Sequence, residues 1–381
     1  MKKFWKNNQK IIKFVFFLFI VWQIFLFVLN FASPFINIPR REGYNYVELK
    51  PFSPKFLWNR ANFDGIHYLD ISRKGYGIYQ QAFFPMYPNL IKLFNPFFLG
   101  RDLLSGIFIS NISFLVLLFL FYKLVIVDYK ESEAKKILII FLIFPLSFFF
   151  GMVYTESLFL MLVLGSFYAA RRNKWLWAGI LGGLASYTRF VGIFLFPALL
   201  YEWYSYGVKD GKRDVGKLMS IFLVPLGLLN YIRFLWEKYG DPFMFMHVLP
   251  FYGSERSSGK IILLYQVFWR YLKMILTTKM DPLYIVVWLE LFISVLFLAL
   301  ILLSFKKGIR TSYLIFSTFA YLSPTLSGTF SSLPRYVLIL FPCFMYLGLI
   351  KNKLFKNFVY AIFGIGFIIF AIMFFQGYWV A

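Results

Sequence analysis

The sequence has little of the chemistry on which many soluble folds depend. Only 15% of its 381 residues are charged, and it contains 17 acidic residues, two histidines and one cysteine. The lone Cys343 cannot form an internal disulfide, which argues against a secreted disulfide scaffold. The basic residues are scattered in short clusters, which argues against a nucleic-acid-binding domain. So few histidines also disfavour a histidine-dependent phosphatase or a cluster of metal ligands.

Apolar side chains are what the sequence has in excess. Hydrophobic residues make up 60% of the chain and aromatic residues 23%, and the mean hydropathy is +0.69. An ordinary soluble domain is about 45–50% apolar. Because a water-soluble globule cannot bury this excess, the sequence predicts an all-α, polytopic membrane protein.

The positive charge predicts which loops face the cytoplasm. The formal net charge is +23, and cytoplasmic loops of membrane proteins carry an excess of lysine and arginine. Six basic clusters are therefore placed in the cytoplasm: Lys2–Lys10, Lys130–Lys136, Arg171–Lys174, Lys209–Lys217, Lys306–Arg310 and Lys351–Lys356. Six acids between Asp128 and Asp214 lie in or beside these loops, and we expect them only to moderate the basic clusters.

The apolar runs between the basic clusters predict about 11 transmembrane helices in a single domain, 1–381, with the N-terminus in the cytoplasm. The first run is too long for a signal peptide. Single spans are expected at about 11–31, 103–127, 217–236, 283–304 and 358–375, and short hairpins within 136–171, 174–209 and 311–350. Segments 32–102 and 237–282 then lie outside, and each is expected to carry an amphipathic interfacial helix.

The first external segment contains the best catalytic candidate, Asp64. If a helix begins there, His67, Tyr68 and Ile71 follow at i+3, i+4 and i+7 on one amphipathic face suited to the bilayer surface. The alternative is that Asp64 only caps this helix by accepting backbone N–H bonds.

Two other acids have simpler interpretations. Asp70 lies three residues before Arg73 and four before Lys74, and is expected to be an exposed ion-pair partner of these bases. Glu290 falls inside a predicted span, where an acid is costly unless it is paired or faces water. It is interpreted either as a cavity residue or as the partner of a basic residue such as Arg233.

The tips of the short hairpins carry charge. Thr155 and Glu156 lie at one tip, Arg189 at the next and Arg335 at the third. An ion pair between Glu156 and Arg189 explains two of these charges structurally. Alternatively, two arginines converging on one outer cavity suit a lipid phosphate, because the planar guanidinium binds phosphate oxygens bidentately.

Several segments together resemble the PIG-V family of mannosyltransferases, which belong to the GT-C class of integral membrane glycosyltransferases. The resemblance covers most of the chain and is carried by Phe63-Asp64-Gly65, His67-Tyr68-Leu69, Gly75-Tyr76, Phe83 to Pro88, Tyr154 to Phe159, Ala178-Gly179, Thr188-Arg189, Gly192 and Pro334-Arg335-Tyr336. It implies a GT-C-like bundle in the cell membrane. It also implies a polyprenyl-phosphate mannose donor, used on the non-cytoplasmic face for glycolipid biosynthesis. The family usually has tryptophan where this chain has Phe63, which keeps an aromatic wall but loses the indole N–H.

The resemblance also suggests roles for these residues. Asp64 is expected to be the general base of an inverting transfer to a lipid or glycan acceptor, with Glu156 as the alternative base. Arg189 and Arg335 would stabilise the leaving phosphate without a metal or cofactor. His67, Tyr68 and Glu156 would bind the sugar or phosphate, and Phe63, Tyr87, Thr155 and Tyr336 are further cavity candidates. The expected partners are the lipid-linked donor, the acceptor and membrane lipids, and not nucleic acid.

Two other function classes stay open at this point. A lipid or solute transporter, such as a flippase, also needs many spans and a few intramembrane charges. Transporters often show inverted repeats, and the two halves of this sequence do not match. A non-catalytic subunit of a membrane assembly is the third possibility, since polar hairpin tips can be purely structural.

Overall fold

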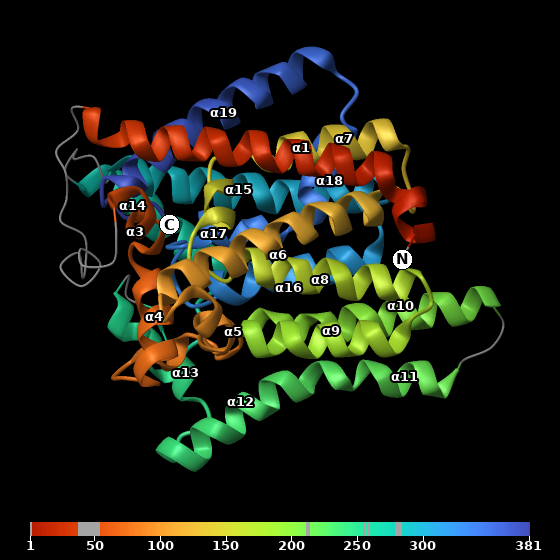
Figure 1. Cartoon of the computed structure of the whole chain (residues 1–381), viewed down its shortest axis with the longest axis horizontal. Coiled ribbons are helices and arrows are strands. Elements are labelled where there is room, and N and C mark those ends of the chain that lie inside the picture. Colours follow the sequence, from red (N-terminus) through yellow and green to blue (C-terminus); the bar gives the residue numbers. More distant parts are fainter. Residues whose placement is uncertain (1, 37–53, 211–213, 254–255, 258, 279–283) are drawn as a thin grey trace.

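The chain folds into apolar helices that run side by side, with short helices gathered at one end, on the left of Figure 1. The computed structural model describes residues 2–36, 54–210, 214–253, 256–257, 259–278 and 284–381. Within these ranges all regular structure is helical, and no strand occurs. Parts of both predicted external segments, 37–53 and 279–282 among them, lie outside the described residues.

Among the residues that the structure describes, five helical segments are long and apolar enough to cross a membrane, which fits the predicted membrane protein. They are formed by α1 (Lys2–Ala32), α6 (Asp102–Val125), α11 with α12 (Val215–Ile221 and Leu223–Tyr239), α15 (Tyr284–Lys306) and α19 (Lys353–Phe375). The count of 11 spans stays a prediction, because six further apolar helices are too short to be assigned by length alone. These are α7 (Glu131–Ile143), α8 (Glu156–Arg171), α9 (Trp175–Thr188), α10 (Leu195–Asp210), α16 (Thr311–Thr325) and α18 (Phe341–Leu349).

Short 3₁₀ or helical turns separate the members of each predicted hairpin. They are η6 (Ser147–Gly151), η7 (Phe190–Phe194) and α17 (Leu333–Tyr336). In consequence, the charged residues beside these turns lie at helix ends: Glu156 begins α8, and Arg189 directly follows α9.

Small residues allow the central helices to approach closely. A Cβ on Gly179 of α9 would lie 1.8 Å from the backbone oxygen of Ser220, and one on Gly227 of α12 would lie 1.9 Å from that of Gly183. Small residues at such crossings are typical of helix packing in membranes, where close backbone contact replaces the hydrophobic effect as a source of stability. α9 is thereby held between α8 and α12.

The short helices at the left of Figure 1 belong mainly to the first of the two predicted external segments. They are α3 (Lys55–Trp58), α4 (Asp64–Lys74) and α5 (Met86–Phe94), and α13 (Met244–His247) of the second segment lies beside them. Arg73 at the end of α4 forms an ion pair with Asp102 at the start of α6. The predicted pairing of Asp70 with Arg73 or Lys74 is therefore wrong, since neither pair occurs among the described residues: the first turn of α6 supplies a buried carboxylate that Arg73 reaches across the fold.

Glu290 has a hydroxyl partner. Its buried carboxylate accepts a hydrogen bond of 2.5 Å from the Tyr271 hydroxyl on α14 (Leu264–Thr277). Arg233 pairs with Glu237, one turn along its own helix, at 2.7 Å. The suggested Glu290–Arg233 pair is therefore wrong, since Arg233 has an exposed local partner and Tyr271 satisfies the buried acid.

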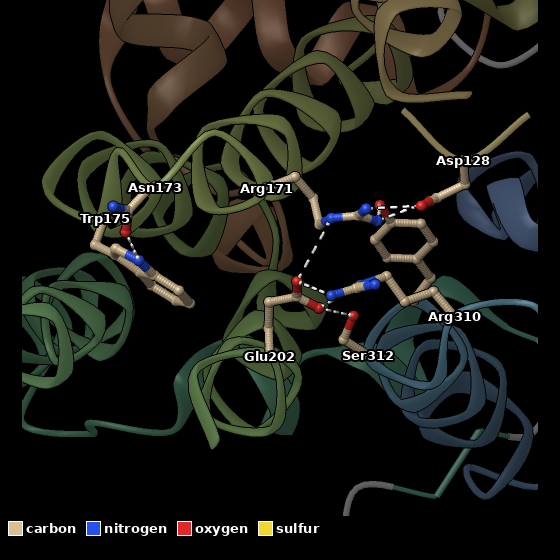
Figure 2. A network of polar contacts seen from close by, with 8 residues as sticks. Asp128, Arg171, Asn173, Trp175, Glu202, Arg310 and Ser312 are labelled. Atoms are coloured by element: carbon tan, nitrogen blue, oxygen red, sulfur yellow. Dashed lines mark hydrogen bonds and ion pairs between the residues drawn. The ribbon is translucent and has the colours of Figure 1, made fainter. Parts of the chain in front are cut away.

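A polar cluster lies at the end of α8 opposite Glu156 (Figure 2). We call Asp128, Arg171, Glu202 and Arg310 the Glu202 cluster. Arg171 donates a hydrogen bond of 2.7 Å to Asp128 from each of its two terminal nitrogens, and its Nε lies 3.7 Å from a carboxylate oxygen of Glu202. Arg310 donates to Glu202 from Nη2 at 2.5 Å and from Nε at 2.7 Å, and the Ser312 hydroxyl donates to Glu202 at 2.7 Å. This cluster ties α8, α10 and α16 to the loop after α6.

Candidate active site

The backbone is strained immediately before Asp64. Phe63 has φ 59° and ψ −117°, a region that a bulky residue adopts only when its surroundings enforce it. α4 begins at Asp64, and no side chain caps its first turn, so the interpretation of Asp64 as a cap is wrong. Gly65 permits the close approach that follows, because a Cβ there would lie 3.2 Å from the Val153 backbone oxygen.

Buried contacts on either side hold Phe63 in this conformation. Tyr154 donates from its hydroxyl to the Asn62 backbone oxygen at 2.7 Å, and the Asn62 side chain donates to the Phe374 backbone oxygen at 3.0 Å. The Phe63 ring packs against Phe374 and Trp379, with centroids 5.8 and 5.1 Å away. Strain of this kind clusters at active sites, where the fold over-determines a side chain's direction.

Four charged side chains meet at this place, and we call Asp64, Glu156, Arg189 and Arg335 the Asp64 cluster. Arg335 Nη1 donates to Asp64 Oδ2 at 2.7 Å, across 271 residues of sequence. Arg189 Nη1 donates to Glu156 Oε1 at 3.0 Å, which confirms the predicted Glu156–Arg189 pair. Arg335 Nε lies 3.4 Å from the same Glu156 oxygen, so Arg335 links both acids.

The hydrogen bonding of the Asp64 cluster is incomplete. Glu156 Oε2 is buried and has no hydrogen-bond partner in the described part of the chain. Arg335 Nε, although near Glu156, makes no hydrogen bond to the described residues. Asp64 Oδ1 likewise has no partner among them. Buried polar groups are normally satisfied, so Glu156 Oε2 and Arg335 Nε are suited to a ligand, and the partly exposed Asp64 is accessible to one.

The Asp64 cluster faces a cavity of about 920 Å³. Nine of the ten predicted site residues line it: Phe63, Asp64, His67, Tyr68, Thr155, Glu156, Arg189, Arg335 and Tyr336. Tyr87 does not. It is fully buried, and its hydroxyl lies 3.0 Å from the Gly106 backbone oxygen and 2.7 Å from Ser110 Oγ. α5 turns Tyr87 towards α6, where it joins the two helices.

His67 and Tyr68 form one wall of the cavity. The His67 ring stacks on Phe83 with centroids 4.8 Å apart, and its Nδ1 lies 3.4 Å from the Gln80 side chain. Burial, with help from the charges of Glu156 and Asp64, raises the pKa of Tyr68 well above its usual value. Tyr68 therefore keeps its proton and is available as a hydrogen-bond donor.

The potential around Tyr336 is positive. Burial alone would raise the pKa of Tyr336, but the guanidinium groups of Arg256, Arg335 and Arg189 outweigh it and lower the pKa below its usual value. The guanidinium carbon of Arg189 lies 4.9 Å from the centre of the Tyr336 ring, and that of Arg335 lies 5.3 Å away. An electropositive cavity of this kind attracts anions.

Sequence reasoning missed two cations of the cavity, Arg256 and Lys260. They lie in an irregular stretch of the second predicted external segment, where no helical periodicity indicates which way a side chain points. One signal was available: basic residues in a predicted external segment run against the positive-inside rule. Within the described ranges, no three side chains of His, Cys, Asp or Glu gather as a metal site.

Comparison with known proteins gives one family. A family model for mannosyltransferase (PIG-V) matches residues 9–248, a range that contains Asp64, Glu156 and Arg189 but ends before Arg256 and Arg335. A search among curated proteins found no match.

Among solved structures, the chain is similar to the oligosaccharyltransferase of Archaeoglobus fulgidus. The apo form gives a TM-score of 0.48 over 95% of this chain, and a form tethered to an acceptor peptide with the NVT sequon gives 0.46 over 96%. Both are 14% identical, and 56% of their length is covered, so the chain spans little more than half of that protein. We draw no functional argument from so distant a likeness. Because the family match spans more than half of the sequence, the chain belongs to the mannosyltransferase (PIG-V) family of membrane glycosyltransferases.

Proposed function

We propose that this protein transfers a mannosyl residue from a polyprenyl-phosphate donor to a lipid-linked or glycolipid acceptor, with inversion, on the non-cytoplasmic face of the membrane. The observation that carries the proposal is Asp64 itself. It follows a strained residue, lines the cavity and has one carboxylate oxygen engaged by Arg335 while the other has no partner among the described residues.

In the proposed reaction, Asp64 Oδ1 accepts the proton of the acceptor hydroxyl. The acceptor oxygen attacks the anomeric carbon, and the bond from that carbon to the phosphate oxygen breaks with its electron pair staying on the polyprenyl phosphate. Attack opposite the departing group inverts the configuration. A positioned base typically contributes about 10²–10⁴-fold to the rate. Arg335 supports this role because its hydrogen bond of 2.7 Å to Oδ2 holds the carboxylate in place and leaves Oδ1 for the acceptor hydroxyl.

The other cavity residues have supporting roles in the proposal. Arg189 and Arg335 donate towards the leaving phosphate oxygen, with no step requiring a metal or other cofactor. His67 and Tyr68, one turn along α4 from Asp64, bind the sugar or phosphate, and the unpartnered Glu156 Oε2 accepts from a sugar hydroxyl. Glu156 is the second candidate for the base, since that oxygen also lacks a competing donor.

The size and lining of the cavity support a large amphipathic substrate. Its volume of about 920 Å³ is near the upper end of the usual range of ligand pockets, roughly 300–1,000 Å³. Aromatic side chains such as Phe83, Phe245 and Trp379 line it together with the charged cluster. This combination suits a sugar phosphate that carries an apolar chain.

The test is transfer by the purified protein in lipid, supplied with labelled polyprenyl-phosphate mannose, a lipid extract from its host and EDTA. Asp64→Asn is compared with Asp70→Asn, a matched control on the same helix that does not line the cavity. We expect label to move to a new lipid with the native protein and with Asp70→Asn, and to be lost with Asp64→Asn. If Asp64→Asn transfers label as fast as the native protein, the general base would be reassigned to Glu156. No transfer from any polyprenyl donor would favour the transporter or the assembly subunit.

A further inference from the structure

The charges that line the cavity do not balance. Among the described residues that line it, four cationic side chains, Arg189, Arg256, Lys260 and Arg335, face two acids, Asp64 and Glu156. The acids contact Arg189 and Arg335, so the Asp64 cluster is neutral in itself. The excess positive charge therefore belongs to Arg256 and Lys260 and lies on the wall formed by the second external segment.

Backbone hydrogen bonds fix this wall against the turn that carries Arg335. The Ser257 N–H donates to the Ser327 oxygen at 2.8 Å, and the Ile262 N–H donates to the Leu326 oxygen at 3.0 Å. These two bonds bracket Lys260 and hold the segment in one register. Arg256 is held from the same side, because its Nη2 donates to the Ser331 oxygen and to Ser332 Oγ, both at 3.1 Å.

No carboxylate neutralises Arg256 or Lys260 by contact within the described ranges, where neither forms an ion pair. Glu290 is near enough to interact with Arg256 electrostatically, but it lies outside the cavity lining and binds the Tyr271 hydroxyl. Arg256 uses only Nη2 for the bonds described above, which leaves its other N–H groups for a ligand. Serine hydroxyls of Ser257, Ser331 and Ser332 also line the cavity.

We propose that Arg256 and Lys260, with the hydroxyls of Ser331 and Ser332, form a phosphate subsite of this cavity, separate from the Asp64 cluster. Its ligand is the phosphate of a lipid phosphate. The remaining N–H groups of Arg256, a lysine ammonium and hydroxyl donors together match the oxygens of a phosphate group. The backbone of Ser332, with φ 65°, is strained at this wall as that of Phe63 is at the Asp64 cluster.

The subsite also explains what the excess positive charge would do in the transfer reaction. This part of the inference rests on the proposed function. A sugar phosphodiester carries one negative charge, and the phosphate monoester that leaves carries a second one. Cations without carboxylate partners stabilise that second charge as it develops, whereas Arg189 and Arg335 already face acids. Arg256 and Lys260 thereby complement the Asp64 cluster without duplicating it.

The experiment measures binding and needs no transfer. Polyprenyl phosphate and a diacyl phosphatidic acid are titrated separately, by calorimetry in detergent, into the native protein and into an Arg256→Ala/Lys260→Ala double variant. We expect the double variant to bind both lipids about tenfold to a hundredfold more weakly, since charged hydrogen bonds are lost. The lipid that binds the native protein more tightly identifies the source of the phosphate.

Arg270→Ala is the matched control. Arg270 also donates to a backbone oxygen of this turn, that of Gly328 at 3.1 Å, but it does not line the cavity. It should bind both lipids as the native protein does. If the double variant does not fold, binding is measured with Lys260→Ala alone, which changes an exposed residue and should also bind both lipids more weakly.

The inference is overturned if the variants bind as tightly as the native protein, if Arg270→Ala weakens binding equally, or if the native protein binds neither lipid. Asp64→Asn should bind polyprenyl phosphate normally. If it does, and if the Arg256 and Lys260 variants lose binding while native transfer is not found, the subsite stands and only the proposed reaction fails.

Discussion

The Asp64 and Glu202 clusters contain the same residue types, two acids and two arginines, at opposite ends of α8. Glu156 is the first residue of this helix and Arg171 the last, so about 22 Å of helix separates them at a rise of about 1.5 Å per residue. In the Glu202 cluster each carboxylate binds an arginine through both oxygens. In the Asp64 cluster each carboxylate binds arginine through only one.

The difference separates charge that stabilises a fold from charge that is available to a substrate. Ser312 adds a further donor to Glu202, and no atom of the Glu202 cluster is buried without a partner. The Asp64 cluster instead borders the cavity, beside three residues with positive φ: Phe63, Tyr79 and Ser332. Composition alone does not distinguish the two clusters; what differs is the satisfaction of their oxygens and the strain around them.

The largest effect on stability is expected from a substitution in the Glu202 cluster. Glu202→Ala leaves Arg310 and Arg171 without a buried carboxylate and should lower the free energy of unfolding by about 3 kcal/mol. The measurement is chemical or thermal unfolding in detergent. Glu237→Ala, in the exposed Arg233–Glu237 pair, is the control and should unfold like the native protein. Equal stability of Glu202→Ala and the native protein would mean that this cluster does not hold the fold.

A smaller effect is expected from Glu156→Gln compared with Glu202→Gln. Glu156→Gln removes the charge that both arginines of the Asp64 cluster contact, so transfer should fall about tenfold to a hundredfold, while the unfolding midpoint should fall less than in Glu202→Gln because Glu156 contacts arginine through only one oxygen. Glu202→Gln should give the reverse pattern. Steady-state transfer and unfolding midpoints are measured on the same preparations. If both variants lose stability alike and keep activity, the two clusters are equivalent and the comparison fails.

The smallest effect concerns the pKa of Tyr336. Arg256 is one of the guanidinium groups that lower this pKa, so Arg256→Ala should raise it towards the ordinary tyrosine value. Ultraviolet titration of tyrosinate detects the change, and a Tyr336→Phe variant identifies which part of the signal belongs to this residue. An unchanged titration would place Arg256 too far from Tyr336 to contribute to the positive potential of the cavity.

Much of the fold follows from sequence periodicity and charge. Long apolar runs predicted the helices of the five candidate spans, and helix breaks occur near the predicted hairpin tips. The Glu156–Arg189 pair was predictable because adjacent hairpins place both residues at the same end of neighbouring helices. Asp64 was recognised as the catalytic candidate from its position at the head of an amphipathic helix.

Other features depend on tertiary contacts that no local pattern encodes. Arg335 meets Asp64 only after the chain folds, and Asp102 outcompetes Asp70 for Arg73 for the same reason. Glu202 was expected only to moderate the cytoplasmic basic clusters, whereas it is buried and binds Arg310 and Ser312. Tyr87 has a residue type typical of a cavity wall, but the direction of α5 buries it.

The most direct test makes the same substitution in each cluster: Asp64→Asn and Asp128→Asn, each assayed for sugar transfer and for unfolding midpoint. We predict that Asp64→Asn loses transfer by about 10²–10⁴-fold at an unchanged midpoint. Asp128→Asn, which weakens the bidentate contact with Arg171, should lower the midpoint and keep transfer. Full transfer by Asp64→Asn, or loss of transfer by a folded Asp128→Asn, would contradict the assignment of chemistry to one cluster and of structure to the other.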